Sequence, residues 1–237
     1  MILAILQARM SSTRLPGKVL KPILGRPMLG WQIERIKRST TIDRLVVATS
    51  QESSDDAIQA FCGANGVLCH RGALHDVLGR FHGAVEAFGP AEHVVRLTAD
   101  CPLIDWTIID AVVTLQRRGG SDLAGNVIER SFPDGLDVEV ASASALDRAH
   151  REATDPSQRE HVTQYIYRHP EKFRLAHLVQ TPDLAALRWT VDTPADFEMV
   201  EKVFAGLAGL NNQFLQQDVL SFLDRHPEIV AINAPVR

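Results

Sequence analysis

The chain has 237 residues, of which 45% are hydrophobic and 23% are charged. This composition is typical of a globular protein that can bury the core of one large α/β domain, whereas two full domains would be cramped. The formal net charge is −4, with both signs interspersed along the chain. A general attraction to polyanions is therefore excluded, nucleic acid is not the expected partner, and any anion site must be built locally.

The sequence has no recognisable targeting or anchoring signal. The apolar run at residues 2–6 lacks a cationic region before it and reaches Arg9 at once, unlike a signal peptide. No apolar stretch approaches the roughly 20 residues of a membrane span. Three cysteines match neither a disulfide framework nor a zinc knuckle, and nine histidines form no close ligand pair on one helical face. We expect a cytoplasmic protein with reduced thiols, no membrane partner and no histidine-bound zinc.

The first half of the chain alternates short apolar runs with amphipathic segments, the pattern of βαβ units. Ser53 and Asp56 have the spacing of a capping box at a helix start. Strands are expected at residues 2–8, 45–49, 67–70 and 94–98, and helices at about 29–36, 53–65, 77–88 and 108–115. These elements predict a mostly parallel sheet with helices on both faces.

The regular alternation ends near residue 126. We interpret residues 126–180 as a β-rich excursion from the sheet, followed by a return strand and a helix that starts at Pro194. The expected elements are strands at 136–140, 173–179 and 187–191, and helices at about 145–153, 160–169, 194–203 and 210–223. The whole chain, residues 1–237, is predicted to form one three-layer α/β/α domain with a mixed, mostly parallel sheet.

A cluster of cations and hydroxyls follows the first predicted strand, at the end of a strand where open α/β sheets bind ligands. Backbone N–H groups and cationic side chains there can face one polyanion, and a glycine lets the main chain approach it closely. The cluster comprises Arg9, Ser11, Ser12, Thr13, Arg14, Gly17 and Lys18. A Walker A loop is excluded, because it requires glycine where Ser12 stands and Ser or Thr where Val19 stands. The alternative is a solvated basic loop without a ligand.

Two aspartates end apolar runs and have a proline within two residues. Asp100 follows the strand predicted at 94–98, and Asp192 follows the one predicted at 187–191. Mg²⁺ commonly takes one or two carboxylates together with phosphate oxygens, so this pair is a candidate metal site. In the structural alternative, Asp100 is a turn residue and Asp192 caps the next helix.

The segment from Ala8 to Leu20 resembles the signature loop of the CMP-sugar synthetases, the acylneuraminate and 3-deoxy-manno-octulosonate cytidylyltransferases. The similarity is greatest to their SpsF-like branch, the cytidylyltransferases of spore coat polysaccharide biosynthesis. It continues through residues 71–72, 76–78, 97–102, 134–139, 159–163 and 191–194. The resemblance implies a fold of the nucleotide-diphospho-sugar transferase type, CTP and a sugar acceptor as substrates, Mg²⁺ on Asp100 and Asp192, and a homodimer formed with residues 126–180.

The resemblance also gives roles to single residues. A sugar hydroxyl would attack the α-phosphorus of CTP while Lys18 and Mg²⁺ stabilise the developing charge, and Arg9 and Arg14 would hold the β- and γ-phosphates. Such transfer needs mainly positioning and charge neutralisation. Arg71 would contact the base or ribose. The other residues expected to contact the nucleotide are Ala8, Ser11, Ser12, Thr13 and Gly17.

The acceptor is expected to meet polar residues of the middle segment, namely Asp137, Glu139, Arg159 and His161. Asp137 and Glu139 would share one face of a strand, and Arg159 could pair with a substrate carboxylate or phosphate through two hydrogen bonds. His161 is a candidate general base. The alternatives are an edge strand that shows its charges to water and a histidine on a helix surface.

Two other functions remain open. A glycosyltransferase that consumes a nucleotide-sugar can use the same fold class, although such enzymes usually hold metal on a DxD motif and this chain has Asp-Cys-Pro at residues 100–102. A noncatalytic nucleotide-binding subunit is the second alternative, which the joint presence of Lys18, Asp100 and Asp192 argues against.

Overall fold

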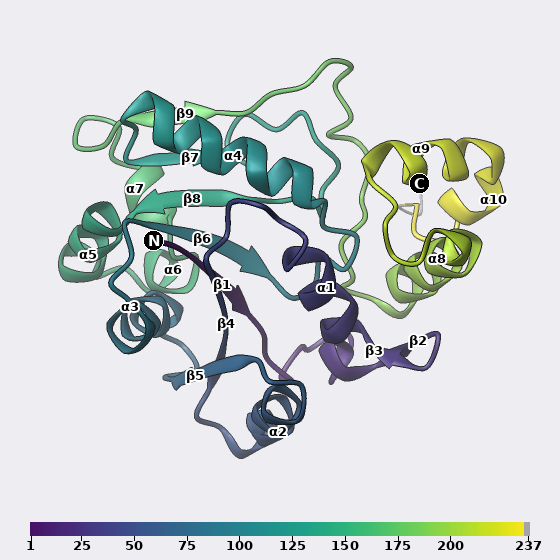
Figure 1. Cartoon of the computed structure of the whole chain (residues 1–237), viewed down its shortest axis with the longest axis horizontal. Helices are drawn as coiled ribbons and strands as arrows, with labels where there is room; N and C mark the ends of the chain where they lie inside the picture. Colours follow the sequence, from purple (N-terminus) through teal and green to yellow (C-terminus); the bar gives the residue numbers. More distant parts are fainter. Residues whose placement is uncertain (235–237) are drawn as a thin grey trace.

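A seven-stranded mixed sheet forms the centre of the molecule in the computed structural model, which describes residues 1–234 (Figure 1). Its order is β5-β4-β1-β6-β8-β7-β9. Neighbouring strands from β5 to β6 are parallel, β8 runs antiparallel to β6 and β7, and β9 is parallel to β7. The strand bounds are β1 (Ile2–Gln7), β4 (Arg44–Ser50), β5 (Leu68–Gly72), β6 (His93–Thr98), β7 (Leu123–Gly125), β8 (Glu139–Ser142) and β9 (Leu175–His177). A separate hairpin pairs β2 (Pro22–Ile23) with β3 (Arg26–Pro27).

Helices cover both faces of this sheet, because alternate side chains of β1 enter two different cores. Ala4 and Leu6 join the core on one face, and Leu3 and Ile5 join the core on the other. The first face carries α1 (Met28–Ile36), α2 (Asp56–Ala64) and α4 (Trp106–Gly119), and the second carries α3 (Val77–Phe88), α5 (Ala143–Glu152), α6 (Pro156–Glu160) and α7 (Gln164–Tyr167). The prediction of a three-layer fold with a mixed, mostly parallel sheet is confirmed.

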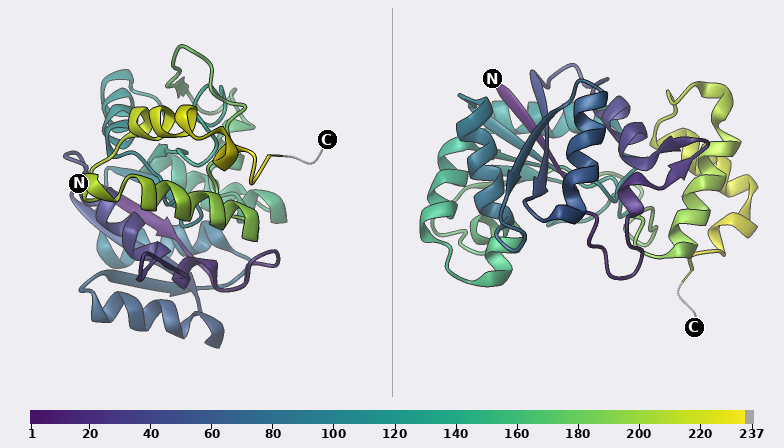
Figure 2. Two further views of the ribbon diagram at one scale, coloured as in Figure 1. Left: turned by 90° about the vertical axis from the view of Figure 1, so that its right-hand side faces the viewer. Right: turned by 90° about the horizontal axis from the view of Figure 1, so that it is seen from below.

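The C-terminal helices pack together at one end of the molecule (Figure 2). They are α8 (Pro194–Gly206), the short 3₁₀ turn η3 (Ala208–Leu210), α9 (Gln216–Arg225) and α10 (Pro227–Val230). The fully buried Arg35 of α1 ties them to the sheet, since its guanidinium donates to the carbonyls of Ile104 and Phe214. No helix within residues 1–234 is long and apolar enough to cross a membrane.

Three local predictions are wrong. The capping box at Ser53 is absent: residues 53–55 form a 3₁₀ turn, η2 (Ser53–Asp55), and the side chain that organises it belongs to Asp55. The helix expected at 160–169 breaks into α6 and α7, because Val162 has a φ of +47°, outside helical geometry. The strand expected at 187–191 contributes only one isolated bridge, between Asp134 and Arg188.

Residues 126–180 do not form a β-rich excursion. Strands β8 and β9 belong to the main sheet, and the rest of the segment contains α5, α6 and α7. The physical reason lies in β8, where Val140 enters one core and Ala141 the other. A strand that is apolar on both faces needs a central place in a sheet.

Candidate active site

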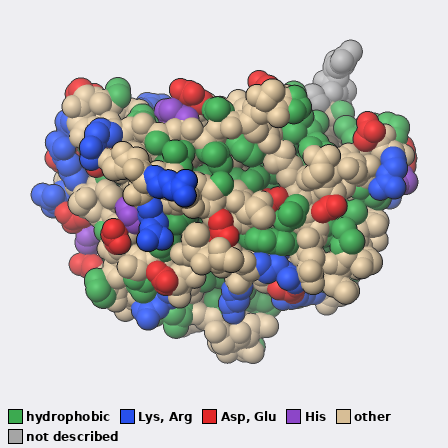
Figure 3. Space-filling model, turned by 45° about the horizontal axis from the view of Figure 1, so that its top comes forward, with side chains coloured by type: hydrophobic (Ala, Val, Ile, Leu, Met, Phe, Trp, Pro, Cys, Tyr) green, Lys and Arg blue, Asp and Glu red, His purple; other side chains and the backbone are tan. Residues whose placement is uncertain are grey.

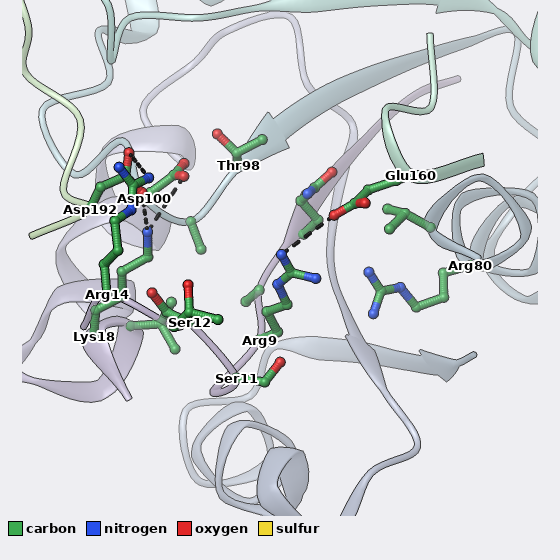
Figure 4. A pocket seen from close by; sticks show the side chains of 16 residues that line it. Arg9, Ser11, Ser12, Arg14, Lys18, Arg80, Thr98, Asp100, Glu160 and Asp192 are labelled. Atoms are coloured by element: carbon green, nitrogen blue, oxygen red, sulfur yellow. Dashed lines mark hydrogen bonds and ion pairs between the residues drawn. The ribbon is translucent and has the colours of Figure 1, made fainter. Parts of the chain in front are cut away.

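A polar cavity opens at the carboxyl ends of β1 and β6, the edge predicted for ligand binding (Figure 4). The loop between β1 and the 3₁₀ turn η1 (Lys18–Leu20) forms one wall, and residues from α3, α6 and the segment before α8 complete it. The lining residues are Gln7, Ala8, Arg9, Ser11, Ser12, Thr13, Arg14, Lys18, Val19, Val77, Arg80, Thr98, Ala99, Asp100, Glu160 and Asp192. The structure thus brings together most of the predicted nucleotide and metal residues.

The loop is closed by its own backbone rather than by a ligand. Gly17 has a φ of +70°, and its N–H donates to the carbonyl of Met10 at 2.9 Å. Glycine is required here because other residues adopt this left-handed conformation at a cost. The N–H of Met10 in turn donates to buried Asp55 at 2.8 Å. Gly17 therefore shapes the loop and does not line the cavity, unlike the close approach to phosphate that was predicted.

Lys18 lies at the base of the cavity and is only 8% exposed. Its Nζ donates to the carbonyl of Val191 at 2.6 Å and to Asp192 Oδ1 at 3.0 Å, and it lies 3.6 Å from Asp100 Oδ2. These contacts fix the long side chain before a substrate arrives. The ammonium group therefore faces three protein oxygen atoms, those of Val191, Asp192 and Asp100.

The two predicted metal ligands lie side by side, since both contact Lys18 (Figure 4). A backbone hydrogen bond from Val191 N–H to the carbonyl of Asp100, 2.8 Å long, joins their two segments. Both carboxylates are partly exposed to the cavity. Within residues 1–234 no group of three or more His, Cys, Asp or Glu side chains is arranged to hold a metal. Two converging carboxylates nevertheless fit Mg²⁺, because substrate phosphates and water supply its other ligands.

Asp192 receives positive charge from three sides. Its Oδ2 lies 3.0 Å from Arg14 and 3.5 Å from Arg188, while Oδ1 faces Lys18. Burial alone would raise the pKa of Asp192, but the hydrogen bond and charge of Lys18 outweigh it and hold this pKa below its ordinary value. The carboxylate therefore stays ionised, as a metal ligand requires.

Asp196 holds the segment that carries Asp192. It is fully buried, forms two hydrogen bonds with Arg188, and accepts the N–H groups of Asp192 and Thr193. With Thr193 it makes the capping box of α8. Thr193, rather than Asp192, is thus the cap of this helix, and Asp192 is left free for the cavity.

Arg9 lies at the opposite end of the cavity from Lys18 (Figure 4). Its guanidinium forms a loose ion pair with Glu160 of α6, at 3.5 Å. Ala8, Ser11, Ser12 and Thr13 also line this cavity, where the nucleotide contacts predicted for them would form. The cavity consequently has one end with Lys18, Arg14 and both aspartates, and a second end with Arg9 and Glu160.

Arg71 does not line this cavity, although a nucleotide contact was expected of it. Its Nε donates to the carbonyl of Ser50 at 2.8 Å, and its terminal nitrogens donate to Asp56, Gln59 and the carbonyl of Glu52. These bonds fasten the loop between β4 and α2 to the end of β5. Donors already engaged with the protein are poorly suited to reading a ligand.

Arg159 is likewise engaged with the protein. It forms two hydrogen bonds with Asp76, at 2.9 and 2.7 Å, and donates to the carbonyl of His150 at 2.8 Å. Asp76 also caps α3 by accepting from Gly79 N–H. Arg159 therefore pins α6 to α3, and the structure does not bring it to the other predicted acceptor residues.

Those residues line a second cavity on the α3 and α5 side of the sheet. Asp137, Glu139 and His161 share it with Arg96, Arg130, Thr163 and Tyr167. Asp137 forms a two-bond ion pair with Arg130, at 2.8 and 2.9 Å. Glu139 is buried and paired with Arg96 and Thr163. Asp137 and Glu139 do face the same cavity, although β8 begins only at Glu139.

The sequence analysis missed Arg80, which lies on α3 and lines the first cavity. It is 2% exposed, and its Nε and Nη1 are buried without a hydrogen-bond partner among the described residues. Its position in an amphipathic helix made it resemble a surface arginine. A polar residue in the apolar stripe of Val77, Leu78 and Phe81 was the available signal.

Comparison with known proteins agrees with this geometry. A family model described as cytidylyltransferase matches residues 3–220. The chain is 34% identical to the spore coat polysaccharide biosynthesis protein SpsF of Bacillus subtilis, over 96% of this chain and 95% of that protein. It is 36% identical to a 3-deoxy-manno-octulosonate cytidylyltransferase of Synechococcus elongatus, over 50% of this chain and 48% of that protein.

The same relationship appears among solved structures. A cytidylyltransferase from Leptospira borgpetersenii superposes with a TM-score of 0.92 at 32% identity, and the match covers 100% of this chain and 98% of that one. The predicted resemblance to the CMP-sugar synthetases and their SpsF-like branch is thereby confirmed, as is the predicted fold. The chain belongs to the cytidylyltransferase family.

Proposed function

We propose that this protein transfers CMP from CTP to an acidic or otherwise modified sugar, releases pyrophosphate, and thereby supplies an activated sugar for surface polysaccharide synthesis. The observation that carries the proposal is the convergence of Lys18, Asp100 and Asp192 in one cavity that the Arg9 to Lys18 loop encloses. The SpsF protein and the 3-deoxy-manno-octulosonate cytidylyltransferase named above support the nucleotide and the kind of acceptor.

The chemistry requires one phosphorus–oxygen bond to form and one to break. The acceptor hydroxyl oxygen attacks the α-phosphorus of CTP, and the bond to the bridging oxygen of pyrophosphate breaks. Lys18 neutralises charge that develops on the α-phosphate, and Arg14 and Arg9 hold the leaving phosphates. Because Lys18 is already fixed by Val191 and Asp192, little reorganisation accompanies the reaction.

Asp100 and Asp192 would hold Mg²⁺ in this reaction. When bound, the metal neutralises phosphate charge and orients the triphosphate. Lys18 and Arg14 then share the remaining negative charge of the phosphates with the metal.

We place the acceptor in the second cavity, which Asp137, Glu139 and His161 line. His161 lines the second cavity and would receive the proton of the attacking hydroxyl. Arg130 and Arg96 also line this cavity, and each is paired with a carboxylate of the protein.

A homodimer is part of the proposal. Strand β9 ends the sheet at an edge, and Ile128 and Val179 near it are exposed apolar residues. On the side of the molecule that Figure 3 presents, apolar side chains gather across the middle. Light scattering coupled to size-exclusion chromatography would give twice the 26.2 kDa chain mass if the dimer forms.

We also propose that the protein acts in the cytoplasm. The unpaired state of Cys62, Cys69 and Cys101 is consistent with this location, because thiols stay reduced there.

A measurement of pyrophosphate release distinguishes this function from the two alternatives, a glycosyltransferase and a noncatalytic nucleotide-binding subunit. The purified protein is incubated with CTP, Mg²⁺ and a panel of acidic sugars, with every component omitted in turn. Release that requires CTP and sugar together supports the transfer. Release of CMP from a CMP-sugar, or of UDP from a UDP-sugar, would instead reveal a glycosyltransferase, and nucleotide binding without turnover on the panel would favour a noncatalytic subunit.

A further inference from the structure

Arg188 contacts Asp192 but does not itself line the nucleotide cavity. One nitrogen of its guanidinium, Nη2, lies 2.8 Å from Asp196 Oδ2 and 3.5 Å from Asp192 Oδ2. This single atom joins the expected metal ligand, Asp192, to a carboxylate that is fully buried. Arg188 therefore acts on Asp192 from the protein side of the site and leaves the cavity side open.

The guanidinium of Arg188 is held in a fixed place. Its other terminal nitrogen, Nη1, donates to Asp196 Oδ1 at 2.5 Å, so the planar group makes two bonds to one carboxylate. Asp196 in turn accepts the N–H groups of Asp192 and Thr193. The side-chain amide of Asn233 donates to Asp196 Oδ1 at 3.1 Å and to the carbonyl of Arg188 at 3.0 Å. Both the backbone and the side chain of Arg188 are thus anchored.

Asp192 has two other cationic partners, but both belong to the cavity wall. They are Lys18 and Arg14, and in the proposed reaction these two cations serve the phosphates. Arg188 is the cationic partner that Asp192 would keep when a nucleotide is bound. Because Asp196 balances the charge of Arg188, the two together can hold a carboxylate in place with little opposition to a metal cation.

We propose that Arg188 is a positioning residue that orients Asp192 as a metal ligand, an inference that rests on the proposed function. It fixes the Oδ2 side of Asp192, while Oδ1 faces Lys18. Carboxylates that bind metals are commonly oriented by hydrogen-bonding partners, and loss of such a partner lowers metal affinity about 10-fold to 100-fold. Lysine cannot replace arginine here, because a compact ammonium lacks the planar fork that bonds Asp196 twice while reaching Asp192.

Calorimetric titration of the protein with CTP, once in Mg²⁺ and once in EDTA, tests this role. We define the metal gain as the Kd for CTP in EDTA divided by the Kd in Mg²⁺. Arg188→Gln should reduce the metal gain about tenfold. The Kd in EDTA should change little, because Arg188 does not line the cavity. In the pyrophosphate assay the same variant should need more Mg²⁺, yet approach the wild-type kcat once Mg²⁺ is saturating.

Two further variants separate positioning from charge and from stability. Arg188→Lys should recover much of the thermal stability through an ion pair with Asp196, but it should not recover the metal gain. Arg159→Gln is the matched control, because it also breaks a two-bond pair between arginine and aspartate, at α6. It should lower Tm as Arg188→Gln does and keep the metal gain. All titrations are made below the temperature at which any variant begins to unfold.

Asp192→Asn is the positive control and should also reduce the metal gain. If it does so while Arg188→Gln keeps the wild-type gain, the positioning role is overturned and the proposed function stands. Full recovery of the gain in Arg188→Lys would show that charge alone suffices. An equal loss in Arg188→Gln and Arg159→Gln would show a merely structural effect, and either result overturns the proposal. Wild-type protein that binds CTP equally well in Mg²⁺ and in EDTA would contradict the proposed metal site itself.

Discussion

Lys18 Nζ and Asp192 Oδ1 lie 3.0 Å apart at the base of the cavity, although the two residues are 174 positions apart in the chain. This contact joins the phosphate loop to the second metal aspartate and places an ammonium group between Asp192 and Asp100. The free energy of transition-state charge stabilisation should depend on it, whereas the fold has other supports at this point, since Arg14 and Arg188 also contact Asp192.

Lys18→Ala should therefore remove activity without unfolding the protein. Loss of one preorganised charge at the reacting phosphate is expected to lower kcat by about 10²-fold to 10³-fold. The melting temperature should fall by only a few degrees, because Asp192 keeps its two arginine partners. Steady-state pyrophosphate release and calorimetric unfolding measure these two effects, and turnover equal to the wild type would remove Lys18 from the mechanism.

Asp100→Asn and Asp192→Asn should raise the Mg²⁺ concentration needed for half-maximal pyrophosphate release. An amide is a poorer ligand for a hard cation than a carboxylate, and each substitution removes one negative charge from the site. Chelation with EDTA should abolish turnover in the wild type, and added Mg²⁺ should restore it. Full activity in EDTA would contradict the metal assignment, and an unchanged Mg²⁺ requirement in both variants would relocate the metal.

Asp196→Asn should destabilise the protein and change its acid sensitivity. Burial would raise the pKa of Asp196, but hydrogen bonds from Arg188 and Thr193 hold it below its ordinary value. A carboxylate with a lowered folded pKa stabilises the native state above the unfolded pKa of about 4, and this contribution is lost as pH falls through the folded pKa. We expect a cost of about 2 kcal/mol at pH 7, measured by urea unfolding.

The difference between wild type and Asp196→Asn should then shrink below about pH 4. Asp224, an exposed residue of α9, offers the matched control Asp224→Asn, for which little change is expected at either pH. A difference between wild type and Asp196→Asn that grows on acidification would show that the carboxylate is not ionised in the native protein.

Arg159 and His161 should have separable effects despite being two positions apart. Because Arg159 pins α6 to α3 through Asp76, Arg159→Ala is expected to cost about 2 kcal/mol of stability, seen as a lower Tm. His161→Ala should instead lower kcat and change its pH profile, since His161 lines the second cavity. The sequence alone assigned Arg159 to the acceptor, and a large rise in acceptor KM with unchanged Tm in Arg159→Ala would restore that role.

The sequence predicted the parallel part of the sheet, from β5 to β6, well because its strands are continuous apolar runs at βαβ spacing. Strands β1, β4, β5 and β6 and helices α1, α3 and α4 lie within a few residues of their predicted bounds. The strands after residue 120 were harder to place. Strand β8 joins the same sheet in antiparallel direction, and only long-range pairing with β6 and β7 decides that.

The site residues also differ in how well the sequence predicts their roles. The loop from Arg9 to Lys18 and the pair Asp100 and Asp192 could be predicted, because each follows a strand or a strand-like run and has a distinctive motif. Arg71, Arg159 and Arg80 could not be ranked from sequence, since the sequence does not show which protein groups each guanidinium contacts. Only the structure shows that protein acceptors engage the first two and that Arg80 has none among the described residues.

The most direct test of the central claim is a pyrophosphate-release assay on wild type and Lys18→Ala, with CTP, Mg²⁺ and a panel of acidic sugars that includes 3-deoxy-manno-octulosonate. The account predicts release by the wild type only when CTP, Mg²⁺ and an accepted sugar are all present, and a loss of at least 10²-fold in Lys18→Ala. Release that does not depend on the sugar, or that Lys18→Ala retains in full, would contradict it.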